Sequence, residues 1–201
     1  MNNQTILKES DVYSGVRAEV HDFYMSDSIG PPTDYMNWLH IIRNSRANDV
    51  IRIHINSPGG DLYTTVQLVD AIKGSNANVI GCVEGQCASA ATIVFLACDA
   101  YYVSPYSMFM FHTYSAGMFG KSSDIYSKIE FKRKFTDFLF EDTYEHVLTK
   151  AELDKMKSGT DIWIDAEEMA VRLNNRNDAR LKEIEEDKPK PRRNARKTKS
   201  K

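Results

Sequence analysis

The feature that most constrains the fold is a repeated change of hydrophobic period along the first 112 residues. Apolar and polar residues alternate in segments such as VIRIHIN, which is typical of a strand with one buried face. Other segments carry apolar residues three and four positions apart, as amphipathic helices do. Alternating strands and helices form βαβ units with right-handed crossovers, so an α/β protein with a parallel sheet is predicted. The predicted strands cover 18–25, 50–56, 78–83, 101–103 and 107–112, and the predicted helices cover 33–45, 62–72 and 89–98.

A single long helix is predicted over 122–148, where the helical period continues without a break. This segment contains more aromatic residues than one buried stripe needs, namely Phe131, Phe135, Phe138 and Phe140. A surplus of this kind is typical of a helix that packs against another subunit.

The two ends of the chain differ from its middle. The formal net charge is −2, yet residues 188–201 carry eight Lys or Arg and no acid, which leaves −10 on the rest. A basic segment with two prolines and almost no apolar side chains is predicted to be a solvated tail. It is either a solubilising extension or a contact for nucleic acid or an acidic partner. We therefore divide the chain into an N-terminal segment (1–22), one domain (23–186) and a tail (187–201).

Several classes of protein are disfavoured by what the sequence lacks. No apolar run approaches the roughly 20 residues that a membrane helix needs. The first residues, MNNQTILKESD, lack the pattern of a secretory signal, so a cytoplasmic location is expected. Cys82, Cys87 and Cys98 have neither metal-site nor redox-motif spacing and are interpreted as reduced core residues. No metal site is predicted.

Two glycine-rich or small-residue segments lie where a predicted strand passes into a predicted helix. In the first, INSPGG, Gly59 and Gly60 allow a close approach of the backbone to a ligand, although turn sterics alone also favour Pro and Gly there. In the second, GQCASAA, small residues surround Ser89 at the start of a helix, whose N-terminus favours an oxyanion. The alternative for Ser89 is a helix N-cap.

His112 and Asp161 are the other candidates for the site. His112 ends the apolar run SMFMF and precedes a loop that contains Gly117 and Gly120, a place from which a side chain can reach into a cleft. Asp161 directly precedes the alternating segment Ile162–Ile164. Considered alone, His112 is more often structural and Asp161 is equally a turn or cap residue.

Together these segments resemble the Clp-type serine peptidases. INSPGGD resembles the oxyanion loop of that family, GQCASAA its nucleophile motif, MFH the strand that carries its base, and DIWIDAEE its acid followed by a short helix. The resemblance implies a triad of Ser89, His112 and Asp161 that hydrolyses peptide bonds of unfolded or extended polypeptides. It also implies an oxyanion hole formed by the backbone N–H groups of Gly60 and Ala90. Substrate contacts are expected near Gly59, Asp61 and Met118.

The same resemblance implies a crotonase-like ββα spiral with a protruding handle helix, and a homo-oligomer of two stacked heptameric rings. It implies that the chain itself binds no cofactor, and that ATP enters only through a partner unfoldase of the AAA+ class. A stand-alone role, such as processing a scaffold or capsid protein as in phage-encoded relatives, is the alternative. Apart from a contact of the basic tail with nucleic acid, neither a membrane nor a nucleic acid is an expected partner.

Two other functions remain as alternatives. A crotonase-type acyl-CoA enzyme shares the spiral and a glycine-rich oxyanion loop, but it would not need Ser89, His112 and Asp161 together. A catalytically silent ring subunit would keep the fold without bringing the three residues into contact. Inactivation of the serine separates both alternatives from a peptidase.

Overall fold

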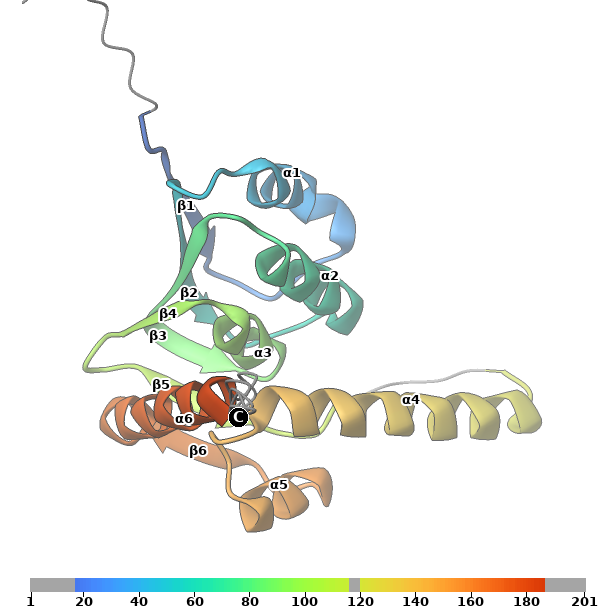
Figure 1. Cartoon of the computed structure of the whole chain (residues 1–201). Helices are drawn as coiled ribbons and strands as arrows, with labels where there is room; N and C mark the ends of the chain where they lie inside the picture. The colour runs from blue at the N-terminus through green and yellow to red at the C-terminus, as the bar shows by residue number, and fades with distance from the viewer. Residues whose placement is uncertain (1–16, 116–119, 187–201) are drawn as a thin grey trace, which may run out of the picture.

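A central sheet with helices packed against it forms the body of the chain in the computed structural model, which describes residues 17–115 and 120–186 (Figure 1). The α/β prediction is confirmed. The strands are β1 (Val20–Met25), β2 (Val50–Ser57), β3 (Asn78–Ala88), β4 (Ala100–Val103), β5 (Met108–Phe111) and β6 (Ile162–Asp165). The helices are α1 (Met36–Asn44), α2 (Leu62–Lys73), α3 (Ala90–Ala97), α4 (Ser122–Tyr144), α5 (Lys150–Lys157) and α6 (Ala166–Glu186).

The six strands are ordered β1-β2-β3-β5-β6, and β4 also pairs with β3. All of these pairs are parallel except β5–β6, which is antiparallel, with Phe111 opposite Ile162. The predicted strands are therefore parallel to their neighbours, as expected, whereas β6 is an additional strand that runs antiparallel to β5. The reason is the connection through α4 and α5, which brings the chain back to the end of β5 that it had left.

The core lies on one face of this sheet. Along β2, Ile51, Ile53 and Ile55 are fully buried, whereas Arg52 on the opposite face is exposed. The helices α1, α2 and α3 lie together on one side of the strands (Figure 1). Residues 90–96 of α3 are all buried, so this helix is apolar on every side and belongs to the core.

Several predicted elements differ in length from the observed ones. β3 continues to Ala88 instead of ending at 83, because its last residues pair with β5. The predicted helix at 33–45 begins as a 3-10 turn, Pro32–Tyr35, before α1. The predicted long helix ends at Tyr144, α5 was not predicted, and α6 has 21 residues where a short helix was expected.

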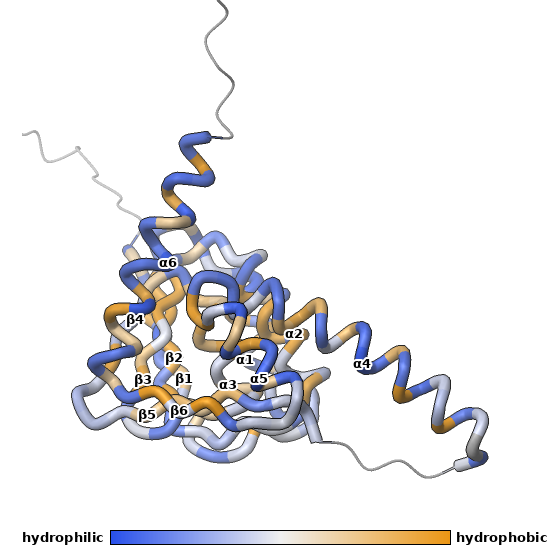
Figure 2. The backbone as a smooth tube through the Cα atoms, turned by 90° about the horizontal axis from the view of Figure 1, so that it is seen from below, coloured by the Kyte–Doolittle hydropathy of each residue, from blue (hydrophilic) through white to orange (hydrophobic). Residues whose placement is uncertain are grey.

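The aromatic surplus of α4 is observed in part. The helix projects from the body with alternating polar and apolar positions (Figure 2). Phe131 and Phe138 are 74% and 69% exposed. Phe140, which was grouped with them, is instead buried and stacks on Tyr144 with ring centroids 5.6 Å apart. The reason is that the last turns of α4 pack on α3, so their aromatic side chains face the core.

The remaining predictions concern cysteines, membranes and the chain ends. Cys82, Cys87 and Cys98 are buried free thiols, as predicted. None of the helices within the described ranges is long and apolar enough to cross a membrane. Residues 1–16, the tail 187–201 and Met118 lie outside the described residues, so the domain boundaries and the substrate contact at Met118 stay predictions.

Candidate active site

Ser89 occupies the junction between β3 and α3 in a strained backbone conformation. Its φ is 54° and its ψ is −127°, a region that residues with a β-carbon rarely adopt. The N–H of Ser89 donates to the carbonyl of Met110 at 2.8 Å, which holds the junction against β5. A strained strand–turn–helix position of this kind projects a serine hydroxyl out of the backbone, where a substrate can reach it.

The backbone of Ser89 is also held from the side of α4. The hydroxyl of Thr92 donates to the carbonyl of Ser89 at 2.6 Å, and the hydroxyls of Thr92 and Tyr144 are 2.9 Å apart. Because the proton of Thr92 is already donated, Tyr144 is the donor of the second bond. A chain of hydrogen bonds therefore connects the buried end of α4 to the carbonyl of Ser89.

His112 directly follows β5 and lies beside Ser89. Its Nε2 is 2.7 Å from Oγ of Ser89. Met108–Met110 pair with Gln86–Ala88 of β3, so one parallel ladder fixes the strand ends that carry both residues. The predicted serine and histidine are thus brought together at hydrogen-bond distance, the arrangement that a nucleophile and its general base require.

Asp161 makes no hydrogen bond to this pair within the described part of the chain. The residue is exposed. The antiparallel ladder ends with Phe111 opposite Ile162, so one further step in the same register places His112 opposite Asp161. Opposed residues in such a ladder have β-carbons about 5 Å apart, which is within reach of a carboxylate–imidazole hydrogen bond.

Gly59 and Gly60 approach the nucleophile from the loop after β2. A β-carbon on Gly59, whose φ is 94°, would lie 2.7 Å from Cβ of Ser89 and 2.8 Å from the nitrogen of Ala90. Gly59 accepts from the N–H of Ile29 at 2.8 Å, and Ile29 in turn accepts from Asp61 at 2.8 Å. The N–H groups of Gly60 and Ala90 donate to no residue that the structure describes. These two donors are therefore available to a ligand beside Ser89.

A pocket of about 500 Å³ opens beside Ser89 and His112. Gly59, Gly60 and Ala90 are part of its lining. Asp61, predicted to contact substrate, also lines it, but its carboxylate accepts from the N–H of Thr64 at 2.7 Å and caps α2. The pocket therefore combines the predicted nucleophile, base and oxyanion donors in one cavity.

Sequence analysis did not identify the contribution of α4 to this pocket. Lys132, Phe135, Thr136 and Phe140 all line it, because the middle of α4 passes over the cavity. Phe135, which the aromatic surplus of this helix predicts in a subunit contact, is 37% exposed and also lines the pocket. The only signal in the sequence was the helical spacing of Lys132, Phe135 and Thr136, which places them close together on the helix surface.

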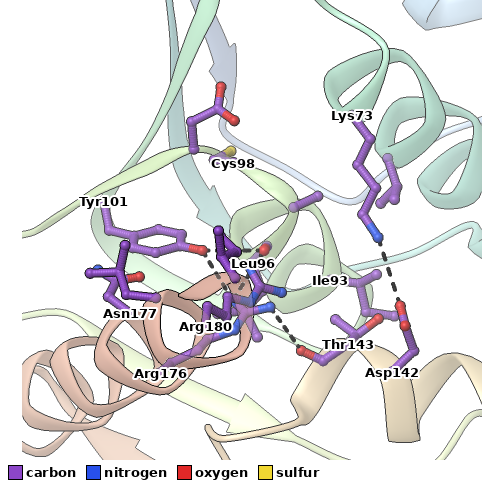
Figure 3. Close-up of a pocket in the computed structure, with 15 residues that line it drawn as sticks. Lys73, Ile93, Leu96, Cys98, Tyr101, Asp142, Thr143, Arg176, Asn177 and Arg180 are labelled. Atoms are coloured by element: carbon purple, nitrogen blue, oxygen red, sulfur yellow. Dashed lines mark hydrogen bonds and ion pairs between the residues drawn. The ribbon is translucent and has the colours of Figure 1, made fainter. Parts of the chain in front are cut away.

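A second pocket, of about 540 Å³, lies at the opposite end of α3 (Figure 3). Arg176 is buried there and donates to the carbonyls of Leu96 and Thr143 at 3.1 and 3.3 Å and to the hydroxyl of Tyr101 at 3.0 Å. These carbonyls belong to the last turns of α3 and α4, where the helix dipoles are negative. Burial lowers the pKa of Arg176. The guanidinium caps both helices and so fixes the far end of the helix that begins after Ser89.

The cysteines near the site are not competing nucleophiles. Cys87, two residues before Ser89, is fully buried, and burial raises the pKa of its thiol well above the ordinary value. Burial also raises the pKa of Cys98. Since the thiolate is the reactive form, neither residue supplies a nucleophile at neutral pH.

Comparison with known proteins finds similarity over most of the domain. The family model of the Clp protease matches residues 23–172, which include Ser89, His112 and Asp161. The ATP-dependent Clp protease proteolytic subunit 2 of Pseudomonas aeruginosa is 30% identical over 141 residues, or 67% of this chain and 68% of that protein.

Proposed function

The chain belongs to the Clp protease family, and on this premise we propose that it is a serine endopeptidase that cleaves unfolded or extended polypeptides with Ser89, His112 and Asp161. The observation that carries the proposal is the 2.7 Å contact between Nε2 of His112 and Oγ of the strained Ser89. A structural N-cap serine would neither need a histidine at this distance nor adopt a positive φ.

In the proposed reaction, Nε2 of His112 takes the proton of Ser89 while Oγ attacks the peptide carbonyl. The N–H groups of Gly60 and Ala90 then donate to the oxyanion of the tetrahedral intermediate. Each such donor lowers the barrier by roughly 3 kcal/mol. His112 next protonates the leaving amine, and water releases the acyl group from Ser89. No step requires a cofactor held by this chain.

Asp161 is proposed to orient His112 and to stabilise its cation. The register of β5 and β6 supports this role, because Phe111 pairs with Ile162, and His112 and Asp161 are the next residues beyond that pair. Catalytic hydrogen bonds are often long or unformed without substrate, so the open geometry is compatible with a triad that closes on binding.

A fluorophosphonate probe tests the proposed nucleophile. The probe should label the chain once, and mass spectrometry should locate the adduct on Ser89, with loss of peptide hydrolysis in proportion to labelling. Prior treatment with a thiol reagent should leave labelling unchanged, since the cysteines are buried. An unlabelled chain that turns over acyl-CoA would favour the crotonase-type alternative. An unlabelled chain without any turnover would favour the silent ring subunit.

The proposed enzyme acts as a homo-oligomer, in two stacked heptameric rings around a chamber, with α4 as the handle helix and a crotonase-like spiral as the body. Exposed aromatic residues on a helix that projects from the body support a subunit contact there. A Clp-type AAA+ unfoldase is the proposed partner and the place where ATP acts. The relative from Pseudomonas aeruginosa carries the words ATP-dependent in its name.

Phe138→Glu should weaken this assembly, because it places a charge on a 69% exposed ring of α4 that does not line the catalytic pocket. Light scattering at micromolar concentration should show a shift from the full particle to a smaller one. Phe138→Leu, which keeps an apolar side chain at the same position of α4, is the matched control and should leave the mass unchanged. A wild-type chain that is a stable, active monomer would contradict the proposed assembly.

A further inference from the structure

We propose that Lys132 selects substrates with an acidic side chain close to the scissile bond. This inference rests on the proposed peptidase function and names the substrate class that its pocket prefers. Lys132 lies in the middle of α4 and lines the same 500 Å³ pocket as Ser89 and His112. A cation in this position meets the side chains of a bound peptide.

The ammonium group of Lys132 has no carboxylate partner within ion-pairing distance among the described residues. Asp61, the acidic residue of the described pocket lining, caps α2. Its Oδ1 accepts from the N–H of Thr64 at 2.7 Å, next to the positive end of the α2 dipole. Lys132 therefore forms no ion pair within the described part of the chain, and the hydrogen bond of Asp61 holds that carboxylate at the start of α2.

Tyr63 keeps the positive charge of Lys132 at the pocket. The ammonium of Lys132 lies 5.9 Å from the centroid of the Tyr63 ring, and both residues line the cavity. A cation over an aromatic face is attracted to the ring, yet the contact leaves the donors of the ammonium free. Lys132 is half-buried, as expected of a lysine whose methylene groups cover an apolar wall and whose ammonium group remains in water.

The other residues of the pocket wall strengthen the proposed preference for an acidic substrate side chain. Phe140, Tyr144 and Thr136 are at most 4% exposed, and Ile93 and Phe135 add further apolar surface. An ion pair in such surroundings is less screened by water than one on an open surface. A substrate glutamate or aspartate gains this ion pair, whereas a lysine would meet a like charge. The apolar wall accommodates the methylene groups of the same side chain.

The test uses peptides with both ends blocked, so that only a side chain offers a carboxylate. Glu, Gln or Lys is placed in turn at the two positions on each side of the scissile bond, and kcat/KM is measured for each peptide. In the wild-type enzyme, Glu should exceed Gln about tenfold at one of these positions, with Lys lowest. In Lys132→Met the ratio of Glu to Gln should fall to about one. In Lys132→Glu the order should reverse, so that the Lys peptide is best.

Lys134→Glu is the matched control, because it makes the same charge change on the same helix outside the pocket lining. Its ratio of Glu to Gln should equal that of the wild type. A ratio near one in the wild type, or one that is unchanged in both Lys132 variants, would overturn the proposed specificity while leaving the peptidase intact. Absence of any cleavage and of fluorophosphonate labelling would instead remove the peptidase function, and this specificity with it.

Discussion

Ser89→Ala is expected to lower kcat for peptide hydrolysis by about 10⁴-fold or more, since it removes the atom that attacks the carbonyl. His112→Ala should cost nearly as much, because Oγ of Ser89 then has no base within 2.7 Å. The double variant should be no worse than either single variant, as the two residues act as a unit. Asp161→Asn should cause a smaller loss, because the residue acts only through the orientation of His112. Hydrolysis of a fluorogenic peptide and fluorophosphonate labelling measure these effects.

The controls for this series are the mass of the particle and its unfolding temperature. Ser89→Ala should keep both, and the strained φ of 54° remains the same for alanine. A clean Ser89→Ala preparation that still cleaves peptides would refute the triad, whatever the fold. Strict additivity of the Ser89 and His112 losses would mean that they do not share one step of the reaction.

Gly59→Ala is expected to be the most damaging substitution outside the triad. The added methyl group would lie 2.7 Å from Cβ of Ser89 and from the carbonyl oxygen of Ala88, both of which belong to rigid elements. Since these atoms cannot yield, the loop must move and carry Gly60 away from the oxyanion. Losing one such donor costs about 10²- to 10³-fold in kcat. The measurement is kcat for a fluorogenic peptide, with fluorophosphonate labelling expected to slow as well.

Gly159→Ala is the matched control for this substitution. Gly159 also has a positive φ, 105°, but a β-carbon there would have no atom within 4 Å. Both variants therefore carry the strain of alanine at positive φ, and only Gly59→Ala carries the clash with the nucleophile turn. Equal losses of kcat in the two variants would show that backbone strain, and not the approach of Gly59 to Ser89, explains the effect.

Much of the fold could be predicted because the signal is local. The alternation along β2 and the helical spacing in α2 each reflect one buried face, which the sequence displays directly. The end of β3 could not be predicted, since Gln86–Ala88 are strand because they pair with β5, and Cys87 also pairs with Ser57 of β2. The direction of β6 likewise depends on where α4 and α5 return the chain. These are properties of tertiary contacts, and no local pattern encodes them.

The residues of the site likewise fall into those that the sequence predicts and those that only the fold reveals. Ser89, His112 and the two glycines follow motifs in which the chemistry dictates residue types at adjacent positions. Lys132 belongs to no such motif, and a lysine on a helix is usually a solvated residue. Its place in the pocket arises only when α4 lies over Ser89. Phe140 is predicted to be exposed because helical spacing alone does not show that the last turns of α4 pack on α3.

The order of the strands also bears on how the site matures during folding. The ladder between β3 and β5 joins Ser89 to His112 through neighbouring parts of the chain. Asp161 follows α4 and α5 in the chain, so it can reach the site only after these helices have formed and β6 has paired with β5. Contacts between distant parts of a chain form late, and synthesis delivers the N-terminal part first. An incomplete nascent chain would thus contain Ser89 and His112 without Asp161, so the proposed triad would be completed only by the last strand of the sheet.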